Sequence, residues 1–139
     1  MLNRIIYVEP SKFGFTNMKK TIRKSYIPPE WTMKIKLVPS ITRERAQQVV
    51  NLFKQSHNKW FAQKFLICSF LSLTAKIAGR FYEEGSLDFD SLVAAGNRGL
   101  IKAANCYDTN ANHSFLAFAV CHIRHEIKLE IQNNPLWLA

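Results

Sequence analysis

The fold of this chain is decided by residues 89–131, FDSLVAAGNRGLIKAANCYDTNANHSFLAFAVCHIRHEIKLEI. The first part follows a capping candidate, Asp88, and predicts a helix with one apolar or small face at Phe89, Leu92, Val93, Gly96, Leu100 and Ala103. The last part predicts a helix from a cap at Ser114 to about Gln132, stopped by Pro135. Residues 108–112, DTNAN, have the composition of a turn. The stretch therefore predicts two amphipathic helices joined by a short polar loop.

Two glycines stand three residues apart in the middle of the first of these helices, at Gly96 and Gly99. Each costs about 1 kcal/mol relative to alanine in a helix interior. We expect them where another helix packs closely against this one.

Two more helices are predicted upstream. The first has a cap candidate at Thr42 and an apolar face at Ala46, Val49, Val50 and Phe53. The second runs from about Lys59 to Glu84, is apolar on more than one side, and ends at Gly85. With no convincing pair of strands, the sequence predicts an all-α fold, with a compact domain of about four helices over residues 41–139.

Residues 1–40 have the composition of an irregular basic arm. Gly14, Pro28, Pro29 and Pro39 interrupt this arm, and it carries eight basic side chains against two acidic ones. Residues 33–37, MKIKL, alternate apolar and basic, which suits a short edge strand or an extended segment that orders on a partner. The cations expected to contact phosphates are Lys19, Lys20, Arg23 and Lys24.

The overall charge favours a polyanionic partner. The 139 residues include 19 Lys and Arg against 10 Asp and Glu, a formal charge of +9, although basic character for solubility alone is the simpler alternative. Cys68, Cys106 and Cys121 are odd in number and widely spaced, which predicts reduced core thiols in a cytoplasmic protein. The most apolar segment, residues 65–78, is too short to span a bilayer, so no membrane association is expected.

The last predicted helix carries a stripe of rings where a simple surface helix would carry Lys and Glu. The rings belong to Phe115, Phe118, His122 and His125, and Arg124 and Lys128 flank them. Exposed rings beside cations bind single-stranded nucleic acid, because bases stack on the rings while cations hold the phosphates. The alternative is that Phe115 and Phe118 are ordinary core residues.

The sequence carries no constellation for catalysis or a cofactor. There is no Gly-rich phosphate loop and no GxSxG, so we expect a binding protein rather than an enzyme. Cys121 and His125 stand four apart and could ligate zinc, but no CxxC pair or second ligand couple accompanies them. We therefore predict no metal site.

Three segments together resemble region two of the main bacterial sigma-factor family. Residues 77–81, IAGRF, match its IAxxY; residues 90–108 match DLIQEGNxGLxKAxxxFD; and residues 115–127 match FxTYAxxWIRxxI. The match covers about residues 60–132. The resemblance implies a transcription initiation factor that docks on the clamp helices of the largest subunit of RNA polymerase core, and that recognises and melts minus-ten promoter DNA.

The resemblance assigns roles by position. The polymerase-docking candidates are Ser91, Ala94, Ala95, Asn97 and Ile101, of which only Asn97 keeps the polar type usual in the family. Candidates for promoter DNA binding are Phe115, Phe118, His122, Arg124, His125 and Lys128. Phe118 stands where the family stacks its flipped adenine.

The chain also departs from the family where promoter melting is done. The tryptophan pair that forms a wedge is Cys121-His122 here, and the basic turn is the uncharged residues 109–112. No helix-turn-helix follows before Ala139, so the resemblance leaves upstream promoter recognition to a companion protein or to further chain. The rival prediction is a sigma-like interaction protein that occupies polymerase or a regulator without reading promoters.

Overall fold

The computed structural model describes residues 26–82 and 87–133, which contain six α-helices and no strand. In chain order these helices are α4 (Pro29–Lys36), α5 (Arg43–Gln55), α6 (Lys59–Ser69), α7 (Leu71–Phe81), α8 (Phe89–Cys106) and α9 (Phe115–Gln132). The all-α prediction is confirmed, but four helices was an undercount.

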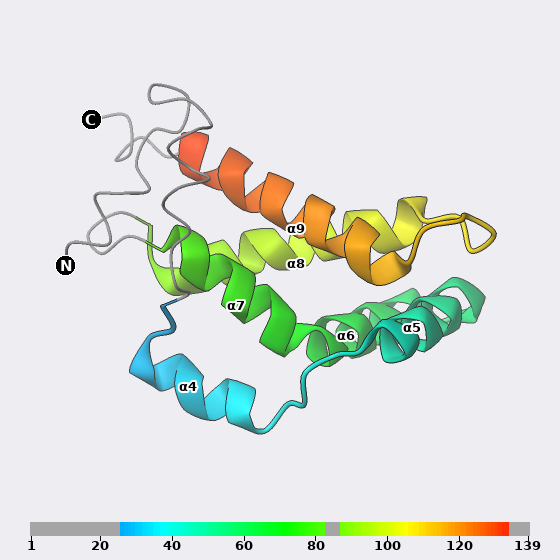
Figure 1. The fold of residues 1–139 in the computed structure, drawn as a ribbon, viewed down its shortest axis with the longest axis horizontal. Helices are drawn as coiled ribbons and strands as arrows, with labels where there is room; N and C mark the ends of the chain where they lie inside the picture. The colour runs from blue at the N-terminus through cyan, green and yellow to red at the C-terminus, as the bar shows by residue number, and fades with distance from the viewer. Residues whose placement is uncertain (1–25, 83–86, 134–139) are drawn as a thin grey trace.

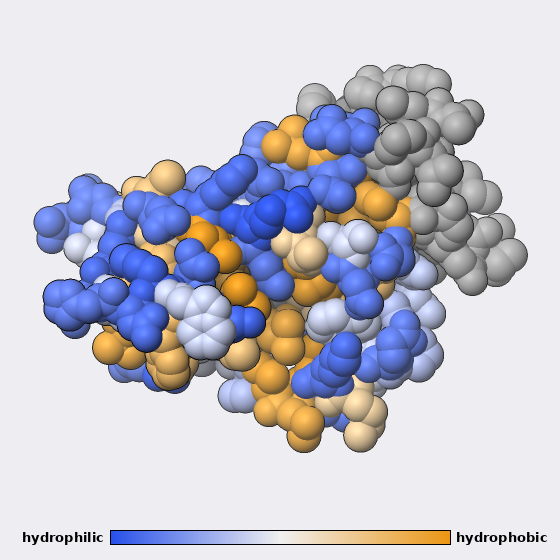
Figure 2. Space-filling view, turned by 180° about the vertical axis from the view of Figure 1, so that it is seen from behind, coloured by the Kyte–Doolittle hydropathy of each residue, from blue (hydrophilic) through white to orange (hydrophobic). Residues whose placement is uncertain are grey.

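Helices α8 and α9 lie side by side along most of their length, and in the view of Figure 1 α8 lies between α9 and the other helices. Helices α5 and α7 both pack against this pair, and α4 lies beside α7. The core holds fully buried side chains from each major helix, including Val49, Leu66, Phe70, Leu92, Leu100, Phe115 and Ile123. The face turned away from the viewer in Figure 1 is largely hydrophilic, and apolar side chains form a band through its middle (Figure 2).

The two glycines of α8 stand where other helices pack closely against it, as predicted: Gly99 faces α9, and Gly96 faces both α7 and α9. A Cβ atom on Gly99 would lie 2.4 Å from the backbone oxygen of His122, and one on Gly96 would lie 2.7 Å from Cγ2 of Thr74. A side chain at position 99 would meet the backbone of α9, and one at position 96 would meet side chains of α7 and α9. The glycines therefore set the spacing between α8 and the helices that cover it.

Side-chain caps begin three of the helices. Thr42 Oγ1 accepts a hydrogen bond from Arg45 N, and Ser114 Oγ accepts one from Ala117 N, so both predicted caps are confirmed. Asn58 caps α6 in the same way and was not predicted. Asp88 precedes α8 as expected but makes no side-chain capping bond, and Gly85 lies outside the described residues.

The long helix predicted from about Lys59 to Glu84 is in fact two helices. The chain bends by 62° at Phe70, which ends α6 and begins α7. The bend lets α6 pack on α5 while α7 packs on α8 and α9. Neither proline nor glycine stands at this point, so the apolar periodicity gave no sign of a break.

The expectation of a strand or irregular structure at residues 33–37 was wrong, because these residues belong mostly to α4. Pro29 suits the first turn of a helix, Glu30 lies near its positive end, and Lys34 and Lys36 lie near its negative end. Trp31 attaches α4 to the domain: its Nε1 donates to Asp90 Oδ1 at 2.6 Å, and its ring meets Phe89 edge-on. Residues 1–25 of the arm, including Lys19, Lys20, Arg23 and Lys24, lie outside the described part.

The prediction of core thiols was also wrong, since Cys68, Cys106 and Cys121 are all free and exposed. Cysteine is small and weakly polar, so its neighbours in sequence did not reveal which helix face it occupies. No single helix in the described ranges has the length and apolarity to cross a membrane; α6 and α7 reach both only when taken together across their bend.

Candidate nucleic-acid interface on α9

Four aromatic side chains contact one another between the end of α8 and the first turns of α9: Tyr107, His113, Phe118 and His122. We call this set the ring ladder. The centroid of His113 lies 5.2 Å from that of Phe118, which lies 4.4 Å from that of His122. Tyr107 supports the ladder from the core side, 5.6 Å from Phe118. Centroid spacings of this size are those of interacting aromatic rings. The ladder offers a ring surface that includes half-buried Phe118 and exposed His113.

The turn and helix α5 hold the start of the ladder in place. Asp108 caps the turn by accepting from Asn110 N, and the Tyr107 hydroxyl donates to the backbone oxygen of His113 at 2.8 Å. Gln47 of α5 donates to the Tyr107 hydroxyl and accepts from Phe115 N, the first residue of α9. One glutamine thus ties α5, the end of α8 and the start of α9 together.

Phe118 and His122 are neighbours because they stand four residues apart on α9. His122 Nδ1 lies 3.0 Å from the backbone oxygen of Phe118, within hydrogen-bond distance. The imidazole is thereby oriented against the phenyl ring. A base stacked on Phe118 would have His113 or His122 as its neighbour.

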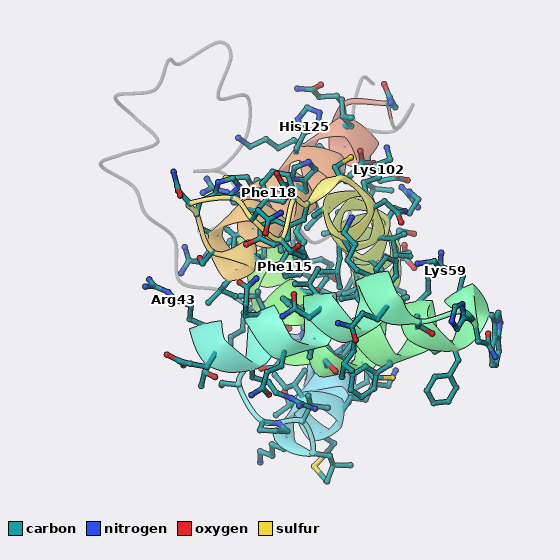
Figure 3. The ribbon with its side chains drawn as sticks, turned by 90° about the vertical axis from the view of Figure 1, so that its right-hand side faces the viewer. Arg43, Lys59, Lys102, Phe115, Phe118 and His125 are labelled. Carbon is teal, nitrogen blue, oxygen red and sulfur yellow. The ribbon has the colours of Figure 1, made fainter. Side chains whose placement is uncertain are left out.

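Phe115, by contrast, is a core residue. Its ring has no exposed surface and lies edge-on to Phe70 at 5.6 Å and to Tyr107 at 5.2 Å. Figure 3 shows Phe115 next to the α5–α6 layer, with Phe118 and His125 farther from it along α9. Stacking on a base requires an open ring face, which Phe115 lacks here. Phe115 is therefore an ordinary core residue, the alternative that the sequence left open.

The acidic side chains of α9 are turned toward α8, where cations pair with them. Glu126 Oε2 lies 2.7 Å from Lys102 Nζ, and Glu130 Oε1 lies 2.7 Å from Arg98 Nη2. Glu126 is 8% exposed. Helix α9 carries two Lys and Arg against two Glu, so its net charge is zero, but its acidic side chains are gathered on the side that faces α8.

The cations of α9 lie on the other side of the helix. Arg124 and His125 are exposed and Lys128 is half-buried; within residues 26–82 and 87–133, neither Arg124 nor Lys128 forms an ion pair. These cations remain available to phosphates on the side of α9 that faces away from Glu126 and Glu130. All six predicted DNA-binding residues lie on α9, and their side chains differ in exposure. Phe115 is buried, whereas the other five are half-buried or exposed: Phe118, His122, Arg124, His125 and Lys128.

The docking candidates of α8 fall into two sets. Ala94 is exposed and Ser91 and Ile101 are half-buried, whereas Ala95 is fully buried and has no surface to offer a partner. Asn97 is half-buried, and its Oδ1 is enclosed without a hydrogen-bond partner.

Sequence reasoning missed three contributors to this region. His113 and Tyr107 were not predicted to join the ring ladder, although their positions on either side of the turn could have suggested it. Gln47 was missed because its role depends on α5 packing beside the turn, which no local pattern reveals. Among the described residues, no group of three or more His, Cys, Asp or Glu side chains could hold a metal ion.

Comparison with known proteins identifies the domain. Residues 66–134 match the family model of sigma-70 region 2. The chain is also similar to the RNA polymerase sigma factor SigA of Mycoplasma genitalium and to that of Mycoplasma pneumoniae, each 30% identical over 99 residues, or 71% of this chain. Those residues make up 20% and 19% of the two relatives, so the chain spans about a fifth of their length. This chain therefore carries a sigma factor region 2 domain over residues 66–134.

Proposed function

We propose that this chain acts in transcription initiation: it binds RNA polymerase core through α8 and holds an unpaired base of the minus-ten strand on the ring ladder of α9. One observation carries the proposal. In a sigma region 2 domain, the rings of Phe118 and His122 lie on the same helix as two cations that form no ion pair within residues 26–82 and 87–133. Rings supply stacking and cations supply phosphate contacts, the combination that single-stranded DNA requires.

The proposed polymerase-docking surface is the outer side of α8. Ser91, Ala94 and Ile101 offer small and apolar contact there, and Asn97 lies at its edge. Arg98 is exposed among them and is held by Glu130 of α9. Apolar contact can replace the charge pairs usual in the family, since burying apolar groups of similar shape avoids the cost of desolvating charges.

A second function is favoured by the residues that differ from the family. Cys121-His122 stands in place of the tryptophan wedge, and the turn at residues 109–112 carries no cation. A domain with these changes could occupy polymerase without opening promoters. A companion protein for upstream recognition stays a prediction under either function.

The deciding experiment combines the full chain, RNA polymerase core and a fluorescent forked promoter probe with an unpaired minus-ten strand. We expect the anisotropy of the probe to rise only when both proteins are present. Phe118→Ala should weaken probe binding roughly 5- to 150-fold, because stacking of one base contributes about 1–3 kcal/mol. Phe118→Tyr, which keeps the ring, should restore most of the binding.

The matched control is Phe61→Ala, which removes an exposed ring from α6 and should leave probe binding unchanged. Polymerase binding without probe retention would reject promoter recognition and favour the second function. Failure to bind polymerase at all would reject both.

The two cations of α9, Arg124 and Lys128, give a separate prediction. If both contact phosphates, replacing Arg124 and Lys128 with alanine should reduce the slope of log K against log salt by about 1.4 to 1.8, since each phosphate contact contributes roughly 0.7 to 0.9. The slope is measured by titrating the polymerase-bound protein with probe at several salt concentrations. Lys36→Ala with Arg43→Ala, two exposed cations on other helices, should leave the slope unchanged; equal slopes for both pairs would remove α9 from the phosphate contacts.

A further inference from the structure

Helices α5 and α6 leave an apolar groove open on the surface, at a distance in sequence from the ring ladder. The groove holds about 470 Å³ and is lined mainly by Leu52, Phe53, Phe61, Ala62 and Phe65. Leu52 is 51% exposed and Phe61 is 61% exposed. Large apolar side chains that line a hollow on a surface mark a site for a partner more often than isolated ones do.

Two cations lie over rings that line this groove, and a third lies over the neighbouring ring of Trp60. Lys59 Nζ lies 4.6 Å from the ring centroid of Phe53, Arg45 Cζ lies 5.7 Å from that of Phe65, and Lys64 Nζ lies 5.5 Å from that of Trp60. No Asp or Glu occurs between Arg45 and Tyr82, a span that carries six Lys and Arg. The groove is therefore apolar along its floor and positive around it.

The helices form an antiparallel pair, which fixes the shape of the site. Arg43 begins α5 and Lys59 begins α6, and Figure 3 places them at opposite ends of the pair. A groove between two antiparallel helices accepts a third helix whose apolar residues recur at i, i+3, i+4 and i+7.

We propose that this groove binds an acidic amphipathic helix of a partner protein. The apolar face of that helix would replace water over Leu52, Phe61 and Phe65, while its carboxylates would meet Arg45, Lys59 and Lys64. The site is independent of α8 and α9, so a partner could bind here while those helices serve another function.

The ring geometry favours this occupant over single-stranded nucleic acid. Base stacking needs open ring faces, but two of the three rings that line the groove, those of Phe53 and Phe65, each have a cation over them. Phe53 is also only 2% exposed. A cation above a ring pairs readily with a carboxylate, whereas a base would have to displace it.

The test uses the full chain and three fluorescent probes. The first is an 18-residue helical peptide with Leu at i, i+3, i+4 and i+7 and Glu on its other face; the second has Lys in place of Glu; the third is single-stranded dT12. We expect saturable binding of the Glu peptide alone. Because burying a Leu or Phe side chain contributes enough for tenfold or more in affinity, Leu52→Ser with Phe61→Ser should weaken it at least about tenfold.

Two variants separate groove binding from general effects. Lys64→Glu with Arg45→Glu should weaken the Glu peptide and strengthen the Lys peptide, while leaving the exposed apolar surface intact. Leu37→Ser, which changes an 82% exposed side chain outside the groove, should have no effect. Circular dichroism melting confirms that each variant is folded.

Several results would overturn the proposal. These are no binding of the Glu peptide, equal binding by the groove variants, and binding of dT12 that the groove substitutions abolish. A groove-dependent dimer in sedimentation without any peptide would assign the groove to a second copy of this chain instead.

Discussion

Phe115→Ala is expected to lower the free energy of unfolding by about 3–5 kcal/mol, the usual cost of removing a buried phenyl ring and leaving a cavity. Phe115 is fully buried where α9 begins and packs edge-on to Phe70 and Tyr107. Its loss would empty the junction between the α6–α7 bend and the ring ladder. Urea unfolding followed by circular dichroism measures the change.

The matched control for Phe115 is Phe61→Ala, because Phe61 is the same residue type and is 61% exposed. Its free energy of unfolding should change by less than about 1 kcal/mol. If Phe115→Ala were as stable as Phe61→Ala, the ring at position 115 would not be a core residue, and a role in base stacking would return to consideration.

Gly99→Ala should also destabilise the domain, even though alanine is the better helix former. A methyl group at this position would lie 2.4 Å from the backbone oxygen of His122 and 3.0 Å from Cγ of Glu126. Backbone atoms have no rotamer to relieve such a contact, so α8 and α9 must separate. We expect the free energy of unfolding to fall by about 1–3 kcal/mol or more. This net loss remains after the roughly 1 kcal/mol that alanine gains over glycine in helix propensity.

Gly96→Ala is the companion measurement. Its new methyl group would meet side-chain methyls, 2.7 Å from Thr74 Cγ2 and 3.2 Å from Ile123 Cγ2, which can shift more easily than backbone. Its cost should therefore be smaller than that of Gly99→Ala. A Gly99→Ala variant at least as stable as the original protein would contradict the close crossing of α8 and α9.

The sequence predicted α8 and α9 well because each carries local signals that agree with its packing. Ser114 caps α9, and the glycines at 96 and 99 predicted the close helix contact that the structure contains. The same agreement between local propensity and tertiary packing is expected wherever the native contacts support one another. These two helices also carry most of the family match.

The bend between α6 and α7 and the helix α4 were not predicted, because both depend on contacts between residues far apart in the sequence. The bend at Phe70 has no proline or glycine; it places α6 against α5 and α8, and α7 against α8, α9 and α4. Helix α4 is attached by Trp31 to Asp90, a contact between residues 59 apart in sequence. Alternation over five residues was too short a pattern to distinguish a strand from a helix.

The residue types of the candidate interface could be predicted from the sequence, but their burial and ion pairs could not, because both depend on long-range packing. The residue types of α9 were visible, but burial separated Phe115 from Phe118, and only the tertiary structure shows that α8 neutralises Glu126 and Glu130. Because Glu126 and Glu130 pair with cations of α8, they do not pair with Arg124 and Lys128 of their own helix. The groove between α5 and α6 depends on how two helices pair, which no motif in either helix records.

Crosslinking from the ring ladder tests whether Phe118 contacts the unpaired minus-ten strand. A benzoylphenylalanine incorporated at position 118 is irradiated in the presence of RNA polymerase core and the forked promoter probe. The same photoreactive group at position 61, on α6, serves as the control. We predict a crosslink from position 118 to the unpaired minus-ten strand that requires polymerase, with none from position 61. Polymerase binding without a crosslink from 118, or equal crosslinks from both positions, would contradict the account.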